Sequence, residues 1–293
     1  MILHEFGSDW TELKLQIINS YLKFYVTALK NMPFQLIYID AFSGSGERHE
    51  KIPGSSLLNQ EEVIVKYDGS VIKALDIEPK FSAYHFIEKH KKRFSRLQEI
   101  TSTYTDHNIH CYNQDANKTI IDLCKSIDWK RNRAVMFLDP YGLSIDYETL
   151  RIIQKTEAID VWYLFSTSGF YRNVPIQYDK LEENQRKRIT KILGSDSWIE
   201  DLFFSNKTAS EVQVDLFDNP VQTAVRETNI EMFENYVQER LKNIFPLVSQ
   251  AFPLPLTGAQ MYSLFFAISN PSPKANALAK KVTDHILKTQ MKP

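Results

Sequence analysis

The residues Ile39-Asp40-Ala41-Phe42-Ser43-Gly44-Ser45-Gly46 place a glycine-rich turn directly after an apolar run that is typical of a buried strand. Two glycines separated by one residue let the backbone turn sharply and approach a ligand without a Cβ clash. The carboxylate of Asp40 could accept a hydrogen bond from the ammonium group of a ligand, or it could orient the loop. A single Gly-x-Gly turn is also common between an ordinary strand and a loop, so the other strand ends must decide.

Apolar runs with the β-branched and aromatic content of buried strands alternate with helical patterns through the first half of the chain. The predicted strands are 36–42, 84–88, 109–113, 134–138 and 161–167. The predicted helices are 10–29, 55–75, 90–101, 116–129 and 147–156. Strand alternating with helix favours a doubly wound, mostly parallel α/β sheet with right-handed crossovers.

The pattern changes after Ser168. A charged helical segment, 177–204, contains a stop signal at Gly194, and a further helix is predicted over 230–244. Two apolar runs follow, 246–252 and 262–269, and their connection rich in proline and glycine indicates an antiparallel hairpin at the edge of the sheet. An amphipathic helix then ends near Lys288. We therefore divide the chain into an N-terminal helix with a cofactor-binding core (1–169), a helical insertion for substrate recognition (170–235) and the completion of the core (236–293).

The composition excludes several classes of protein. The 35 Lys and Arg residues nearly balance the 36 Asp and Glu residues, giving a formal net charge of -1, so there is no global basic field for non-specific nucleic-acid binding. The two cysteines, Cys111 and Cys124, exclude a disulfide scaffold and are expected to be plain thiols. No apolar run reaches the roughly 18 residues of a membrane span, and residues 1–10 do not read as a signal peptide. We expect a cytoplasmic protein.

Two nucleotide-binding loops do not fit the turn at Asp40. The dinucleotide fingerprint needs a small residue three positions after Gly46, where His49 stands, and an acidic residue roughly 20 positions on, much closer than Glu88. A P-loop would need a Gly-Lys-Ser/Thr sequence, which is absent. Gly54-Ser55-Ser56 instead indicates a helix N-cap that is delayed by a loop over 47–53. Such a delay suits a ligand without a pyrophosphate at the helix terminus.

Acidic residues also follow the next two predicted strands. Glu88 could accept both ribose hydroxyls of a nucleoside, or it could be a solvated residue at the start of a helix. Asp115, followed by Ala116, could cap the helix at 116–129, accept from an adenine amino group, or do both. Because ligands of open α/β sheets bind at the carboxyl ends of the strands, position favours a binding role for Glu88.

The fourth strand ends in Phe137-Leu138-Asp139-Pro140-Tyr141-Gly142, which is the most informative motif. Pro140 fixes φ and removes a donor, so the carbonyl groups beside it can face a pocket. Asp139 adds an acceptor, and Tyr141 offers a ring face to a flat substrate or a sulfonium ion. The motif resembles the Asp-Pro-Pro-Tyr motif of amino-group methyltransferases, with one proline where those enzymes have two.

Together the four strand ends are similar to class I S-adenosylmethionine-dependent methyltransferases, over residues 34–167. Nearly the whole chain resembles the three-Cys-motif partner (TcmP) family, most weakly over 170–235. The motifs that carry this resemblance are Trp10-Thr11-Glu12-Leu13-Lys14-Leu15, the turn at 39–46, Gly54-Ser55, Phe86-Ile87-Glu88, Asp115-Ala116-Asn117, the Asp139 motif and Phe265-Phe266-Ala267-Ile268-Ser269-Asn270-Pro271. The resemblance implies a methyltransferase-like protein with a partner protein that carries three cysteines. It does not supply the substrate.

The leading hypothesis is methyl transfer from S-adenosylmethionine. Asp139, Pro140 and Tyr141 would position the acceptor. The cofactor-binding residues would be Lys14, which would seat the cofactor carboxylate, Asp40, Phe42, Gly44, Gly46, Ser55, Glu88 for the ribose, Asp115 for the adenine, and Ala116. The acceptor would be an amino group on a nucleic-acid base or on a partner peptide, and the oligomeric state stays open. A non-catalytic interaction protein with the same fold is the alternative.

Other polar residues have simpler interpretations. His85, His107 and His110 lack the spacing of metal ligands, so no metal site is expected. The run Arg186-Lys187-Arg188 could contact phosphates, although a solvated helix face is the simpler prediction. The segment 166–169 after the fifth strand either lines the pocket or forms a polar turn.

Overall fold

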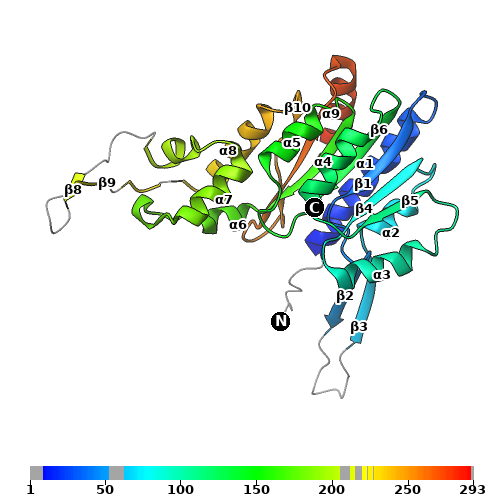
Figure 1. Cartoon of the computed structure of the whole chain (residues 1–293), viewed down its shortest axis with the longest axis horizontal. Helices are drawn as coiled ribbons and strands as arrows, with labels where there is room; N and C mark the ends of the chain where they lie inside the picture. Colours follow the sequence, from blue (N-terminus) through cyan, green and yellow to red (C-terminus); the bar gives the residue numbers. More distant parts are fainter. Residues whose placement is uncertain are drawn as a thin grey trace.

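The computed structural model describes residues 9–52, 63–204, 212–214, 220–222, 224–226 and 228–291. Its main sheet has the strand order β10-β12-β7-β6-β1-β4-β5, with β11 paired to β12 (Figure 1). The strands of this sheet are β1 Gln35–Asp40, β4 Ala83–Ile87, β5 Ile109–Tyr112, β6 Asn132–Leu138, β7 Ile159–Phe165, β10 Leu247–Val248, β11 Phe252–Leu254 and β12 Tyr262–Ile268.

The chain changes direction across the sheet beside β1. The pairs β1–β4, β4–β5, β1–β6 and β6–β7 are all parallel, so the sheet grows first to one side of β1 and then to the other. The strand β12 is antiparallel to β7 and to both β10 and β11. This order, with one reversed strand near the edge, confirms the class I methyltransferase fold predicted from the sequence. The carboxyl ends of β1, β4, β5 and β6 lie at the switch point, where such sheets bind ligands.

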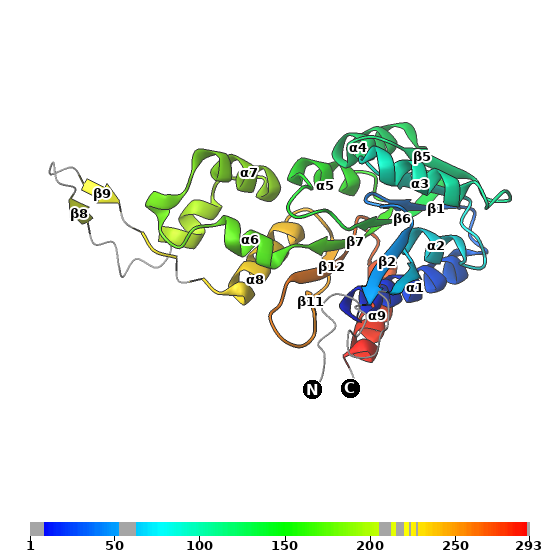
Figure 2. The same ribbon diagram turned by 90° about the horizontal axis from the view of Figure 1, so that it is seen from below.

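Helices cover both faces of the sheet. Figure 2 shows α1, α2 and α9 on one side and α4 and α5 on the other. Two apolar cores result, since alternate residues of the buried strands point to opposite faces: Tyr38 packs with α1 and Ile39 with α4. The helices are α1 Asp9–Leu29, α2 Ser70–Leu75, α3 Lys91–Thr101, α4 Ala116–Ser126, α5 Tyr147–Gln154 and α9 Pro273–Gln290.

The predicted helix over 55–75 is wrong for most of its described part. Strand β2 (Glu47–Ile52) pairs antiparallel with β3 (Val63–Asp68), and only Ser70–Leu75 is helical. The β-branched run at Val63 favours a strand, and the charged positions around it allow a hairpin that projects from the body (Figure 1). The loop predicted over 47–53 is therefore a strand up to Ile52. The N-cap predicted at Gly54-Ser55-Ser56, and with it the cofactor role of Ser55, lies outside the described residues.

An insertion that is mainly helical follows β7 and extends from one end of the molecule (Figures 1 and 2). Gly194, with φ 77°, ends α7, as the sequence predicts. The buried guanidinium of Arg226 donates to the carbonyl oxygens of Tyr171, Val174 and Pro175, so the last part of the insertion is held against its first helix. The elements are α6 Thr167–Asn173, η1 Tyr178–Lys180, α7 Glu183–Leu193, η2 Glu200–Phe204, β8 Val212–Val214, β9 Pro220–Gln222 and α8 Ile230–Lys242.

Within the described part of the chain, no helix combines the length and the apolar character that a membrane crossing requires.

Candidate functional site

The turn after β1 is built from backbone that only glycine adopts easily. Gly44 and Gly46 have φ angles of 61° and 83°, in the left-handed region. Gly69 lies so close to this turn that an added Cβ would stand 2.6 Å from the carbonyl oxygen of Gly46, to which the Gly69 N–H donates. The turn is thus held between β1 and the start of α2.

The side chain of Asp40 is fully buried behind the turn. Its Oδ1 accepts from the N–H of Phe42 at 3.1 Å, and its Oδ2 accepts from the hydroxyl of Ser70 at 2.6 Å. Burial raises the pKa of Asp40 to about 7. Of the two roles that the sequence left open for Asp40, these contacts favour orientation of the loop.

Ser43 joins the turn to the end of the neighbouring strand β4. Its hydroxyl donates to the carbonyl oxygen of Asp40 at 2.9 Å and accepts from the N–H of Ile87 at 3.1 Å. Its own N–H donates to the carbonyl oxygen of Ile87. These bonds fix the turn relative to Glu88, which follows Ile87.

A pocket of about 460 Å³ opens beside this turn, at the carboxyl ends of β1, β4 and β5. Among the residues predicted for the cofactor and the acceptor, it brings together Phe42, Glu88, Asp115, Ala116 and Tyr141. Arg93, Asn117 and Ser144 also line it, although no role was predicted for these three residues. Asp40, Gly44, Gly46, Lys14 and Asp139 lie outside its lining.

Glu88 lies at the floor of the pocket with its side chain only 3% exposed. Its Oε1 accepts from the N–H of His90 at 2.6 Å and from Nη2 of Arg93 at 3.2 Å. No described residue donates to Oε2, so one carboxylate oxygen of Glu88 remains open for a ligand hydroxyl.

Asp115 caps α4 as predicted. Its Oδ1 accepts from the N–H groups of Asn117 and Lys118, at 3.1 and 3.4 Å, and its Oδ2 accepts from the exposed Nζ of Lys89 at 3.1 Å. Burial on its own raises the pKa of Asp115, but the bonds from Lys89 and Lys118 outweigh it and hold the pKa below its usual value. Asp115 is thus a charged acceptor at the rim.

Asp139 pairs with the N-terminal helix. Its Oδ2 lies 2.5 Å from Nζ of Lys14, whose side chain is buried. The ammonium group also lies 5.4 Å from the ring centre of Trp10 and 5.7 Å from that of Phe137. Trp10 in turn stacks on Tyr262 of β12, with ring centres 4.9 Å apart. The carboxylate therefore stands at the edge of an aromatic cluster that joins α1 to β6 and β12.

The next two residues differ sharply in exposure. Pro140 is buried, whereas Tyr141 is 64% exposed. The guanidinium of Arg93 lies 4.5 Å from the ring centre of Tyr141. Partial burial raises the pKa of the Tyr141 hydroxyl, and the charge of Arg93 works against this rise. Arg93 thus connects the carboxylate of Glu88 with the exposed ring of Tyr141.

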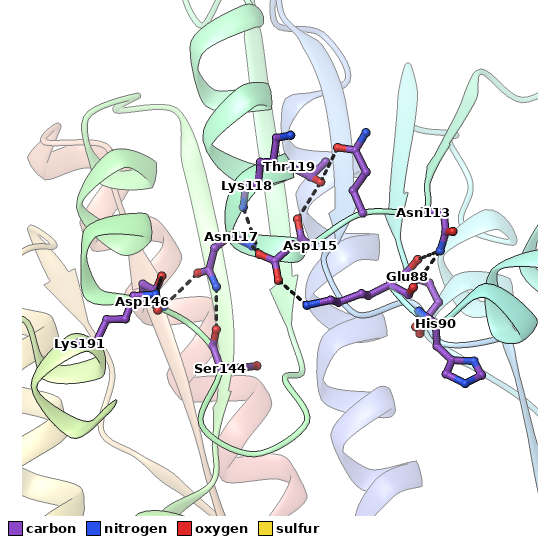
Figure 3. A network of polar contacts seen from close by, with 12 residues as sticks. Glu88, His90, Asn113, Asp115, Asn117, Lys118, Thr119, Ser144, Asp146 and Lys191 are labelled. Atoms are coloured by element: carbon purple, nitrogen blue, oxygen red, sulfur yellow. Dashed lines mark hydrogen bonds and ion pairs between the residues drawn. The ribbon is translucent and has the colours of Figure 1, made fainter. Parts of the chain in front are cut away.

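Asn117 holds the loop that follows the Asp139 motif (Figure 3). Its Nδ2 donates to the carbonyl oxygen of Ser144 at 2.8 Å. Its Oδ1 accepts from the N–H of Asp146 at 3.0 Å and from the hydroxyl of Thr149 at 2.8 Å. One amide side chain at the start of α4 therefore sets the path of the chain from Asp139 to α5.

The helical insertion contacts the same loop from the other side. The guanidinium of Arg188 donates to the carbonyl oxygen of Leu143 at 3.4 Å, and Lys191 lies 3.0 Å from the carboxylate of Asp146. Arg186 and Lys187, the other members of the basic run, pair with Asp196 and Glu183 on the surface.

The predicted polar turn after β7 is the start of α6. Thr167 is fully buried and its hydroxyl lies 2.5 Å from that of Ser263, which donates to Glu234 of α8 at 2.6 Å. The segment therefore connects the sheet to the insertion.

The histidines fall in two places. His85 stacks on His110 with ring centres 4.8 Å apart, and its Nδ1 lies 2.9 Å from the hydroxyl of Tyr112. His107 contacts Asp106 and the carbonyl oxygen of Leu75. Over the described ranges, no three His, Cys, Asp or Glu side chains are grouped as metal ligands. Cys111 and Cys124 are free thiols.

No family model and no curated protein matches the sequence. Among solved structures, protein LPL1258 from Legionella pneumophila (family model DUF519) is similar with a TM-score of 0.50 at 12% identity, over 98% of this chain and 94% of that one. Magnesium protoporphyrin IX methyltransferase from Synechocystis gives a TM-score of 0.36 at 8% identity, over 87% and 80% of the two chains. The putative methyltransferase yhhF from Escherichia coli gives 0.31 at 12% identity, over 57% and 74%. At these identities the similarity concerns the fold, and the resemblance to the TcmP family stays a prediction.

Proposed function

We propose that the protein is an S-adenosylmethionine-dependent methyltransferase that methylates an amino group. The observation that carries this proposal is the common position of Glu88, Asp115 and Asp139, which follow β4, β5 and β6 at one edge of the sheet. Tyr141 connects the pocket that contains Glu88 with the motif at Asp139, because it lines that pocket and lies two residues after Asp139 in the chain.

The pocket would hold the nucleoside half of the cofactor. The open Oε2 of Glu88 would accept the ribose hydroxyls, and Asp115 with the backbone of Ala116 would bind the adenine edge. The backbone at Phe42, Gly44 and Gly46, held in place by Asp40, would surround the methionine half. The buried ammonium group of Lys14 would bind the carboxylate of this methionine half through a charge-assisted hydrogen bond. When bound, the cofactor supplies an electrophilic methyl group on a sulfonium sulfur.

The acceptor side needs residues that bind and orient an amine. The carboxylate of Asp139 and the carbonyl groups beside Pro140 would accept hydrogen bonds from the amino group and aim its lone pair. Catalysis would then come from alignment and from polar stabilisation of the charge that moves to the nitrogen. The exposed ring of Tyr141 favours a flat amine, such as a nucleic-acid base turned out of its stack.

Methyl transfer can be tested with isotope-labelled cofactor. The purified protein is incubated with the labelled cofactor and with separate pools of cellular nucleic acid and protein, and the label is followed into each pool. The proposal expects label in nucleic acid, and loss of this label in Asp139→Asn and Tyr141→Ala but not in the surface variant Asp284→Asn. Label in the protein pool would identify a peptide as the acceptor and would contradict the proposal that the acceptor is a nucleic-acid base. Cofactor binding without transfer to either pool would contradict the enzyme activity and indicate a non-catalytic interaction protein.

A further inference from the structure

A second pocket lies at the opposite edge of the sheet from the site described above. It has a volume of about 230 Å³ and lies between α1 and α9, which pack against each other. Arg133 and Asp160 reach it from the amino ends of β6 and β7, whereas Asp139 follows the carboxyl end of β6. The pocket is therefore separate from the proposed methyltransferase site.

A carboxylate faces this otherwise mainly apolar pocket. The Oδ2 of Asp160 accepts from the hydroxyl of Tyr21 at 2.7 Å. Among the residues that the structure describes, Tyr21 is the sole hydrogen-bond donor to Asp160. The carboxylate of Asp160 is half-buried and has this single neutral donor, so a cationic partner in the pocket would stabilise it further. Burial raises the pKa of Asp160 to about 7, although the bond from Tyr21 and the charge of Arg133 work against this rise.

Aromatic rings surround the same space. Tyr21, Phe24, Tyr25 and Phe34 all line the pocket. The faces of aromatic rings attract organic cations, and rings combined with a carboxylate are the chemistry by which proteins bind ammonium groups.

The neighbouring cation, Arg133, is already engaged elsewhere. Its Nη1 donates to the carbonyl oxygens of Trp129 and Asn132, both at 2.7 Å, and its guanidinium lies 4.0 Å from the ring centre of Phe34. In the described part of the chain it forms no ion pair with Asp160.

The side chains at the mouth of the pocket are apolar. Met32 and Leu278 are 51% and 50% exposed, and both contribute to the lining. A ligand whose apolar body contacts these two side chains would remove them from water.

We propose that this pocket binds a small organic ammonium ion, with the ammonium group on Asp160 among the aromatic rings and an apolar body against Met32 and Leu278. This site goes beyond the proposed methyl transfer and does not depend on it. The ligand class is a primary or methylated amine with a short aliphatic or aromatic body.

Three ligands of one chain length test the proposal by isothermal titration at about pH 8, where amines are still cationic. Hexylamine is expected to bind at least about tenfold more tightly than hexan-1-ol, because only the cation gains the attraction of the carboxylate and the rings. Hexanoate is expected to be the weakest of the three. Equal affinity for hexylamine and hexan-1-ol, tighter binding of hexanoate, or no binding of hexylamine would each overturn the proposal.

Variants separate the ammonium contact from the apolar contact. Asp160→Asn keeps an acceptor for Tyr21 and is expected to remove the preference for hexylamine over hexan-1-ol. Leu278→Trp, at an exposed position that does not endanger the fold, is expected to weaken both ligands. Asp284→Asn, on the surface of α9, should bind like the wild type. A preference for hexylamine that survives in Asp160→Asn would contradict the assignment of the ammonium site. Because none of these titrations contains S-adenosylmethionine, failure of the proposed methyltransferase activity would leave their outcome unchanged.

Discussion

The ammonium group of Lys14 lies 2.5 Å from Oδ2 of Asp139, so the N-terminal helix is paired with the Asp139 motif that follows β6. The sequence assigned these two residues to different ligands, Lys14 to the cofactor carboxylate and Asp139 to the acceptor amine. The pair connects the two roles, because a cofactor carboxylate could replace Asp139 as the ion-pair partner of Lys14. The carboxylate of Asp139 would then be available to bind the acceptor. This exchange predicts that the cofactor binds before the acceptor.

Replacement of Lys14 by alanine tests the cofactor half of this exchange. Lys14→Ala should weaken S-adenosylmethionine binding by roughly tenfold to a hundredfold, because a charge-assisted bond to the carboxylate is lost. Lys280→Ala is the matched control, since Lys280 also forms an ion pair with an aspartate, Asp284, but on the surface of α9. Titration calorimetry gives both affinities. An unchanged affinity in Lys14→Ala would refute the role of Lys14.

Glu88 offers a test of the proposed nucleoside site. Glu88→Gln keeps the size of the side chain and one oxygen for the N–H of His90 but removes the charge, so the affinity for S-adenosylmethionine should fall by roughly tenfold or more. The matched control is Glu99→Gln on the neighbouring helix α3, where the carboxylate is exposed and pairs with Arg96. Equal losses in the two variants would argue against ribose binding at Glu88.

Asn117 should control the order of the loop after Asp139. Asn117→Ala removes the acceptor of the Asp146 N–H, so hydrogen exchange at this amide should become faster, and unfolding should be easier by about 1–3 kcal/mol. Asn108→Ala removes an exposed side-chain amide that makes one long hydrogen bond, to the carbonyl oxygen of Ser82. This variant should change neither the hydrogen exchange of the Asp146 amide nor the free energy of unfolding. Wild-type exchange at Asp146 in Asn117→Ala would show that other contacts hold the loop.

The stability that Asp40 and Asp160 contribute should fall as pH rises from about 4 to about 7. Burial raises the pKa of Asp40 and of Asp160 to about 7, well above 3.8, the ordinary value of the side chain. At these two groups the native state therefore binds more protons than the unfolded chain within this window, and their contribution to stability is greatest below it.

Asp160→Asn removes one of these two titrations. We expect its free energy of unfolding, measured by urea denaturation, to fall less between about pH 5 and pH 8 than that of the wild type. The difference between the two decreases should be on the order of 2 kcal/mol. Asp284→Asn should follow the wild-type curve. Parallel curves for Asp160→Asn and the wild type would contradict the raised pKa of Asp160.

Most of the sheet could be predicted because its strands are short apolar runs that end on polar residues. The apolar runs of β1, β4, β5 and β6 each end at or just before an acidic residue. Both the order of the elements and the acidic strand ends could therefore be predicted from the sequence. The hairpin of β2 and β3 was not visible. Its charged residues resemble an amphipathic helix, and the β-branched run at Val63 was the one local signal for a strand.

Arg93 and Asn117 show why part of the candidate site could not be predicted. Both lie in the first turn of a helix, where an arginine or an asparagine is unremarkable. Their roles depend on which chain segments come together in space: Arg93 with Glu88 and Tyr141, and Asn117 with the loop at Ser144. The sequence likewise contained no sign that Lys14 would pair with Asp139, 125 positions away.

Titration of the wild-type protein with S-adenosylmethionine asks whether the protein binds this cofactor at all. We expect saturable binding of one cofactor per chain, weakened in Glu88→Gln and Lys14→Ala and unchanged in Glu99→Gln and Lys280→Ala. Absence of heat from the wild type at roughly millimolar cofactor, a concentration that would detect binding worth only about 4 kcal/mol, would contradict it.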